Sequence, residues 1–212
     1  MTTYLSYFIE GFLLQASLIL ALGAQNIFVL ESGLKKNRAL IVASVCSVCD
    51  AFLILLGVLG ASSLFVKVPV LKSVFGVIGV GFLLFYGVKK IKEGLFEGHS
   101  EKLETDRTPT IKKAIMLSLG FSLLNPHVYL DTLVLIGGYA AKYPELNERL
   151  SFGAGSSSFS FFWFFGLALF SSRMNRVLNN KSGMKVISLI SGVILLILTW
   201  KLGIDVISWI EF

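Results

Sequence analysis

The stretch SLLNPHVYLDT, residues 122–132, places a helix breaker, an imidazole and a carboxylate within one of the most apolar parts of the chain. Asparagine is favoured at a helix N-cap and proline at the first helical position. Asn125 and Pro126 therefore predict that a new helix begins in the middle of an apolar segment. The free N-terminal amides of such a helix favour an anion such as a carboxylate. A simple proline kink is the alternative.

The apolar segments around this stretch are long enough to cross a membrane. Residues 11–30 and 150–172 carry no charged side chain, and only 15% of all 212 residues are charged. Uncharged apolar runs of about 18 residues or more are typical of transmembrane helices. The first run lacks the basic start and cleavage site of a signal peptide, so we expect it to be retained. The sequence predicts an all-α integral membrane protein with six transmembrane helices: Leu5–Leu30, Ala39–Val66, Val70–Val88, Ile111–Ala141, Leu150–Ser172 and Val186–Ile210.

Lysine and arginine are distributed unequally between the two ends of these helices. Of the 19, 14 fall in the loops after the first, third and fifth spans, 4 fall on the other side, and Lys201 lies within the sixth span. Because basic loops stay in the cytoplasm, both termini are expected outside, on the periplasmic or extracellular side. If the first span does not cross fully, the N-terminus lies inside and five spans remain. The basic loops account for the net charge of +6, so it gives no reason to expect a nucleic-acid partner.

The six spans divide into two halves, residues 1–88 and residues 111–212, joined by a mixed-charge cytoplasmic linker at residues 89–110. An odd number of spans in each half turns the second half upside down relative to the first. This is the plan of inverted-repeat transporters, whose binding sites lie where broken helices of the two halves meet. The sequence thus predicts two inverted three-helix repeats.

The first span carries a polar interruption that matches the one in the fourth. It reads GAQN at residues 23–26, where Gly23 can end one helix and Asn26 can cap the next. A proline kink explains one break but not polar breaks in both halves. We therefore expect the first helix of each half to be broken.

Each half also carries one carboxylate far from the membrane surface. Asp50 lies 12 residues after Arg38, about 18 Å along a helix, and Asp131 lies 11 residues before Lys142, about 16 Å from the outer face. Ionisable residues at such depth usually mark a substrate or ion path; pairing with a neighbouring hydroxyl or amide is the alternative. Both aspartates are candidates for proton coupling. His127 is either a third proton-coupling residue, because imidazole titrates near neutral pH, or a residue that hydrogen-bonds the backbone at the helix break.

Two cysteines suggest an alternative function. Cys46 and Cys49 form a C-x-x-C pattern next to Asp50. This is compatible with a membrane thiol–disulfide oxidoreductase, but a spacing of three in an apolar helix favours two inert buried thiols. A divalent-cation exporter of the same architecture is a second alternative, and it would gather several carboxylate, Cys or His ligands around one point. Only Asp50, Asp131 and His127 qualify, so we expect no metal site and no cofactor.

Together these residues resemble the lysine and arginine exporter family of the LysE/ArgO type. The likeness is carried by LALGAQNIFVLESGLKK at residues 20–36, VCSVCDAFLILLGVLG at 45–60 and LNPHVYLDTLVLIG at 124–137, and it extends over most of the chain. It implies a transporter rather than an enzyme, placed in the bacterial inner membrane and exporting L-lysine, L-arginine or both. Related exporters of homoserine and threonine tend to have lysine where His127 stands, so His127 points to the basic amino-acid branch. A homodimer is left open.

The resulting hypothesis assigns the two ends of the substrate to two kinds of group. The substrate carboxylate is expected to bind the Gln25 and Asn26 amides and the helix start at Asn125–His127. The cationic groups of the substrate are expected to bind Asp50 and Asp131. The expected partners are the amino acid and the lipid bilayer, and export would be driven by proton antiport or the membrane potential while the two halves rock around the site. The candidate substrate-binding residues are Gln25, Asn26, Asp50, Asn125, Pro126, His127 and Asp131.

Overall fold

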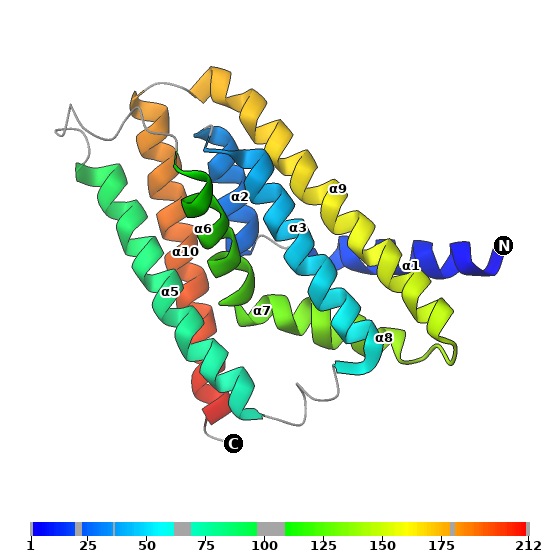
Figure 1. The fold of residues 1–212 in the computed structure, drawn as a ribbon. Coiled ribbons are helices and arrows are strands. Elements are labelled where there is room, and N and C mark those ends of the chain that lie inside the picture. Colours follow the sequence, from blue (N-terminus) through cyan, green and yellow to red (C-terminus); the bar gives the residue numbers. More distant parts are fainter. Residues whose placement is uncertain are drawn as a thin grey trace.

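The structure, a computed structural model, describes residues 2–19, 23–35, 37–61, 69–96, 109–178 and 181–210. Within these ranges the chain is helical, with short turns between helices, as predicted (Figure 1). The elements in chain order are α1 (Thr2–Ile19), α2 (Ala24–Leu34), α3 (Ala39–Leu56), the π-helical turn η1 (Gly57–Ala61), α5 (Pro69–Phe96), α6 (Ile111–Leu123), α7 (Pro126–Val128), the π-helical segment η2 (Tyr129–Ile136), α8 (Gly137–Ala140), α9 (Leu146–Leu178) and α10 (Lys181–Ile210).

In the described ranges, three single helices are long and apolar enough to cross a membrane: Ala39–Gly60, Leu146–Asn175 and Lys185–Ser208. Two bent helix pairs pass the same test when each pair counts as one span, which brings the number to five. These five correspond to the predicted first, second, fourth, fifth and sixth spans.

The predicted third span, Val70–Val88, lies within the single helix α5. That α5 makes a sixth crossing stays a prediction. This helix continues to Phe96, so the start of the predicted linker is helical. Residues 62–68, which include the end of the predicted second span, and linker residues 97–108 lie outside the described residues.

The predicted break at Asn125 and Pro126 is confirmed. α6 and the continuous helix Pro126–Ala140 meet at a bend of 62°. Asn125 is the N-cap, because its side-chain oxygen accepts a hydrogen bond from the backbone N–H of His127 at 3.2 Å, and Pro126 occupies the first helical position. The polar residues of the opening stretch therefore start a helix inside an apolar segment.

The break in the first half is present, but its residues act differently from the prediction. α1 and α2 are bent by 80°, and residues 20–22 between them lie outside the described residues. Gly23 was expected to end a helix, but it stands at the N-cap of α2 in an extended conformation. Asn26 was expected as the cap, but it lies in the first turn of α2. The physical reason is that its side chain bonds back across the break, where Nδ2 donates to the Ile19 carbonyl at 2.8 Å.

Each broken helix lies along an unbroken helix of the other half. α1 and α2 follow α9: the Ser151 hydroxyl donates to the Tyr4 carbonyl at 2.7 Å near its start, and Asn175 Nδ2 donates to the Leu34 carbonyl near its end. The helices α6 to α8 follow α3 in the same manner. Arg38 Nε donates to the Pro109 carbonyl at 2.7 Å at one end, and η1 packs against α8 at the other.

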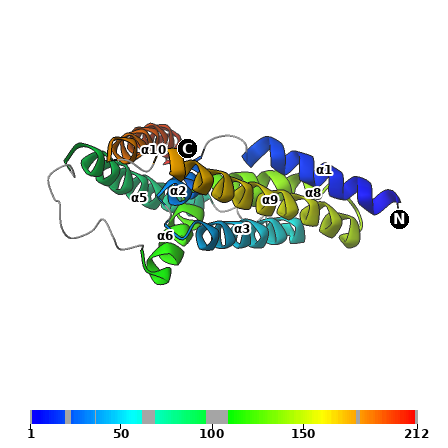
Figure 2. The same cartoon turned by 90° about the horizontal axis from the view of Figure 1, so that it is seen from above.

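The third helices of the two halves, α5 and α10, pack together over their length (Figures 1 and 2). Gly79 of α5 lies beside Leu202, and Gly94 lies beside Leu189. These two contacts show that the helices run in opposite directions.

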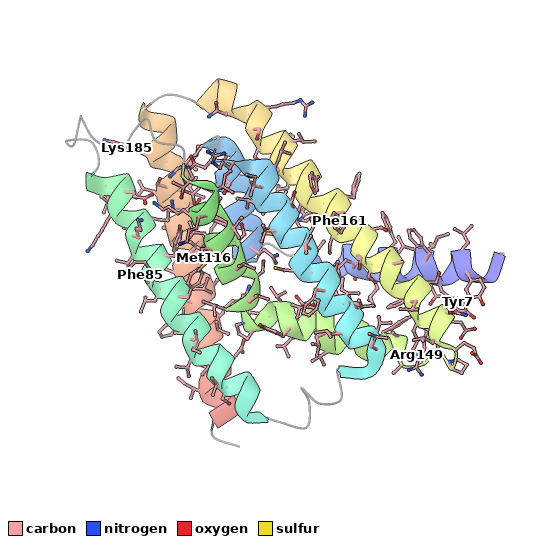
Figure 3. All side chains as sticks on the ribbon, in the orientation of Figure 1. Tyr7, Phe85, Met116, Arg149, Phe161 and Lys185 are labelled. Carbon is pink, nitrogen blue, oxygen red and sulfur yellow. The ribbon has the colours of Figure 1, made fainter. Side chains whose placement is uncertain are left out.

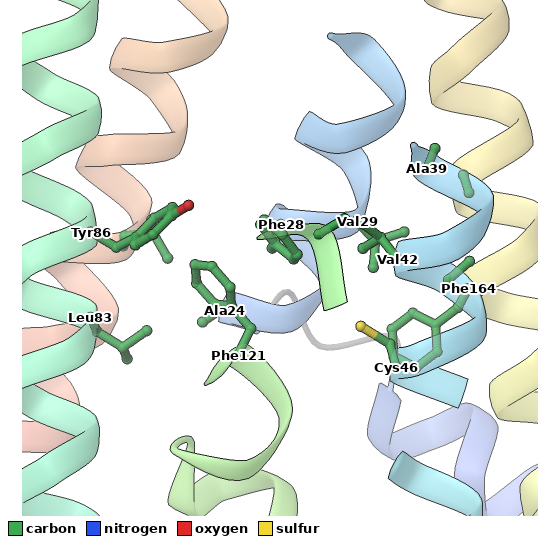
Figure 4. Close-up of a cluster of buried hydrophobic side chains, with 14 of the residues drawn as sticks. Ala24, Phe28, Val29, Ala39, Val42, Cys46, Leu83, Tyr86, Phe121 and Phe164 are labelled. Carbon is green, nitrogen blue, oxygen red and sulfur yellow. The ribbon is translucent and has the colours of Figure 1, made fainter. Parts of the chain in front are cut away.

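An aromatic core fixes the inner ends of the broken helices (Figure 4). Phe28 of α2 and Phe121 of α6 stack with ring centroids 4.5 Å apart, and Tyr86 of α5 meets Phe121 edge-on at 5.0 Å. On the outside of the molecule many apolar side chains are exposed, among them Phe85 (67%) and Met116 (61%) (Figure 3). An apolar outer surface suits contact with lipid.

Two glycines allow α1 and α9 to approach each other closely. A Cβ atom added to Gly155 would overlap the carbonyl of Phe8, and one added to Gly11 would overlap the carbonyl of Phe152. Small residues at such crossings let helix backbones pack in membranes.

The substitution Gly155→Ala tests this contact. Alanine is the better helix former by up to about 1 kcal/mol, but its methyl group would overlap the Phe8 carbonyl, and overpacking costs about 1–3 kcal/mol. We expect the thermal unfolding temperature of the detergent-purified protein to fall. The control is Gly166→Ala on the same helix, where the added atom meets open space. An unfolding temperature for G155A at or above that of G166A would contradict the close packing.

Candidate functional site

The carboxylate of Asp50 lies at the centre of a buried group of polar side chains. Asp50 stands on α3 and is only 2% exposed. Its Oδ1 accepts a hydrogen bond from Gln25 Nε2 at 3.3 Å, and its Oδ2 accepts one from the Ser160 hydroxyl at 3.1 Å. Gln25 belongs to the first turn of α2 and Ser160 to the middle of α9. One hydrogen-bond donor therefore comes from each half of the chain.

Two more side chains extend this group. Gln25 Nε2 also donates to the hydroxyl oxygen of Ser122 at 3.0 Å, near the end of α6 and just before the second break. On the other side, Gln15 Nε2 of α1 donates to the Ser160 hydroxyl oxygen at 2.8 Å. The set, called the Asp50 cluster below, is buried throughout and consists of Gln15, Gln25, Asp50, Ser122 and Ser160.

Asn26 lies beside the Asp50 cluster and closes the first break. Its Nδ2 donates a hydrogen bond to the Ile19 carbonyl. This is one of the last carbonyls of α1, and such carbonyls have no hydrogen-bond partner within their own helix. Its Oδ1 accepts a hydrogen bond from Trp163 Nε1 of α9 at 3.1 Å. The break is therefore tied to α9 close to Ser160.

The second break is closed by a similar device. The Tyr129 hydroxyl donates to the carbonyl of Leu123, the last residue of α6, at 2.8 Å. Asn125 caps the helix that follows, and both Asn125 and Pro126 are buried. In each half, a side chain just after the break bonds a carbonyl just before it.

His127 and Asp131 continue along this second helix. His127 Nε2 lies 3.8 Å from Asp205 Oδ2 on α10, and both side chains are 45% exposed. The structure thus places the imidazole toward α10 rather than in the Asp50 cluster. Asp131 lies on η2 and is partly buried.

A second charged cluster lies at the predicted cytoplasmic end of the helices. The buried carboxylate of Glu31 on α2 lies 2.7 Å from Lys35 Nζ and 2.7 Å from Lys90 Nζ of α5. Glu93 lies 3.0 Å from Lys90, and Lys35 also donates to the Ser188 hydroxyl of α10 at 2.7 Å. Burial raises the pKa of Glu93, but the ammonium groups of Lys90 and Lys35 outweigh burial and hold the pKa below its usual value. These contacts hold the ends of α2, α5 and α10 together.

The structure also shows the residues on which the two alternative functions, a thiol–disulfide oxidoreductase and a divalent-cation exporter, would depend. Cys46 and Cys49 are free thiols, and both are buried in α3. Reactive thiols generally sit in electropositive, partly exposed surroundings, whereas buried ones are inert. Across the described parts of the chain, no three His, Cys, Asp or Glu side chains lie close enough together to hold a metal ion. Neither alternative gains support from this placement.

Gln15, Ser122 and Ser160 were not among the predicted site residues. Gln15 interrupts an otherwise apolar run, and Ser160 belongs to a group of serines at residues 156–160. The sequence shows that these side chains are polar, but not which residues they contact. Those contacts depend on how α1, α6 and α9 pack, and local sequence does not determine that packing.

Comparison with known proteins identifies relatives over nearly the whole chain. The model of the LysE type translocator family matches residues 16–206. The arginine exporter protein ArgO of Salmonella enteritidis PT4 (strain P125109) is 35% identical over 203 residues, which covers 94% of each chain. The protein of the same name from Enterobacter sp. (strain 638) is 35% identical over 211 residues, which covers 98% of each chain. No solved structure matches the chain.

The matched range includes both helix breaks and both deep aspartates, Asp50 and Asp131. These features and the apolar helices describe a membrane-embedded transporter with several crossings. The chain therefore belongs to the family of LysE-type translocators.

Proposed function

We propose that this protein exports L-arginine, L-lysine or both from the bacterial cytoplasm across the inner membrane. The observation that carries the proposal is the Asp50 carboxylate, buried beside both broken helices and bonded by one residue of each half. A buried carboxylate suits a ligand that brings a guanidinium or ammonium group. The two relatives named as arginine exporters give the same substrate class.

We also propose six crossings in two inverted repeats, residues 1–88 and 111–212, joined by the linker 89–110. Helix directions support this plan. α3 and α9 run in opposite directions, because Asp50 bonds Ser160 while Ile54, further along α3, lies beside the earlier residue Gly153. α5 and α10 are also antiparallel, and each broken helix runs parallel to its long partner in the other half. Equivalent helices of the two halves therefore point in opposite directions, as inverted repeats require.

Substrate recognition in this proposal uses different groups for the two ends of the amino acid. The carboxylate binds at the helix start Asn125–His127, where the helix dipole favours an anion, with help from the Gln25 and Asn26 amides. The cationic groups bind Asp50 and Asp131. Binding between the halves lets them rock around the substrate by alternating access.

Export of a cation must overcome the membrane potential. Moving one positive charge outward against an inside-negative potential costs about 2.3 kcal/mol per 100 mV. Exchange for one incoming proton cancels this cost, and Asp50, Asp131 and His127 are the groups proposed to carry the proton. Export driven by a steep internal gradient alone is the alternative.

The substitutions Asp50→Asn and Asp131→Asn test the binding site. Each removes the charge that pairs with the substrate cation, worth about 1.5–3 kcal/mol for a charged hydrogen bond, so export of labelled arginine and lysine should fall about 10- to 100-fold. The control is Glu145→Gln in the exposed turn before α9. Wild-type rates in both aspartate variants, at equal amounts of protein in the membrane, would refute the proposed site.

Reporter fusions test the six crossings. An enzyme that is active only outside the cytoplasm should be active when fused before Met1 or after Phe212, and inactive when fused in the linker at residues 97–108. Opposite activities at the two termini would contradict the inverted repeat and leave five crossings.

Inside-out membrane vesicles test proton coupling. Their lumen corresponds to the outside of the cell, so export appears as uptake of labelled arginine. An acidic lumen should accelerate uptake, and collapse of the pH gradient with nigericin should remove the acceleration. Uptake that does not respond to nigericin would exclude proton antiport while leaving export itself intact.

A further inference from the structure

Gln15 carries a buried polar atom that has no hydrogen-bond partner among the residues that the structure describes. The side chain is only 2% exposed, and its Oε1 has no hydrogen-bond partner in the described part of the chain. An unpaired buried acceptor is destabilising, and inside a membrane lipid cannot relieve it. A group of this kind needs an explanation, and one explanation is a ligand that uses it.

The direction of the Gln15 amide follows from the hydrogen bonds around Ser160. A serine hydroxyl has one proton to give, and Ser160 gives it to Asp50 Oδ2 at 3.1 Å. The lone pairs of Ser160 then accept from a donor, and Gln15 Nε2 supplies it at 2.8 Å. The amide nitrogen is thereby fixed toward Ser160, and the amide oxygen faces elsewhere. The Gln15 side chain is therefore already held in place, and no other described residue pairs its oxygen.

We propose that Gln15 is a further substrate-binding residue, whose side-chain oxygen accepts a hydrogen bond from the cationic group that Asp50 neutralises. The inference rests on the proposed export of basic amino acids and adds a contact from α1 to that site. Ser160 bonds both the Gln15 amide nitrogen and the Asp50 carboxylate, so one hydroxyl holds the two side chains next to each other.

The chemistry of this pair favours guanidinium over ammonium. A guanidinium group has five N–H donors in a rigid planar fork, so it can use two acceptors at once. An ammonium group is a compact charge with three donors, and its energy depends mainly on the carboxylate. Gln15 should therefore contribute more to arginine binding than to lysine binding.

Ligand-dependent thermal stability of the full-length purified protein tests the inference. A ligand that binds only the folded state stabilises it by RT ln(1 + [L]/Kd) and so raises the unfolding temperature, and titration with L-arginine and then L-lysine therefore gives an apparent Kd for each. We expect Gln15→Leu to weaken arginine about 10-fold and lysine by less than half of that factor. The matched control, Ser17→Ala, removes an exposed hydroxyl of α1 that bonds only toward Leu14, and it should match wild type for both.

Each outcome of this titration has one meaning. Equal weakening of arginine and lysine overturns the contact and makes Gln15 a positioning residue for Ser160. Unchanged binding in Q15L, with Asp50→Asn impaired, overturns the Gln15 inference and leaves the proposed function standing. A wild-type protein that responds to neither amino acid overturns the proposed function and the Gln15 inference together. If Q15L does not fold, Gln15→Asn keeps the amide but withdraws it by one methylene, and the same loss of arginine selectivity is expected.

Discussion

A helix interrupted inside a membrane leaves backbone groups that must be paired by protein, because lipid offers no hydrogen bonds. This constraint decides much of the structure. In the first half Asn26 pairs a carbonyl at the end of α1, and in the second half Tyr129 pairs a carbonyl at the end of α6. Asn125 pairs the amide of His127 at the start of the following helix. The breaks are stable only because side chains close to them in sequence are committed to closing them.

The closed breaks determine where a charge can be buried. Asp50 stands on an unbroken helix, but the donors to its oxygens come from α2, which begins at the first break, and from α9, which also bonds Asn26 through Trp163. A change in the angle of either broken helix would alter those donors. The hydrogen bonds of this carboxylate therefore depend on the relative position of the two halves, which is the coordinate that would change in the proposed alternating-access cycle.

Local patterns predicted the helical class, the N-cap at Asn125 and the break in each half, because capping and hydropathy are properties of short segments. The same patterns assigned Gly23 and Asn26 the wrong roles. A cap is predicted from the preference of a residue type for the helix start, whereas the Asn26 side chain bonds the Ile19 carbonyl seven residues earlier. Gln15 and Ser160 could not be predicted as neighbours, because they are 145 residues apart in the chain. His127 faces Asp205 for a similar reason: the position of α10 is set by its packing on α5.

The exchange of helices between halves has a consequence for biogenesis. α1 and α2 pack most extensively against α9, which is synthesised much later. At about 5–20 residues per second, the 145 residues from Gln15 to Ser160 take about 7–30 s. During that time Gln15 and Asn26 are in or near the bilayer without Ser160 and Trp163, the α9 residues that bond them. The first half therefore gains these contacts only when the second half has been synthesised.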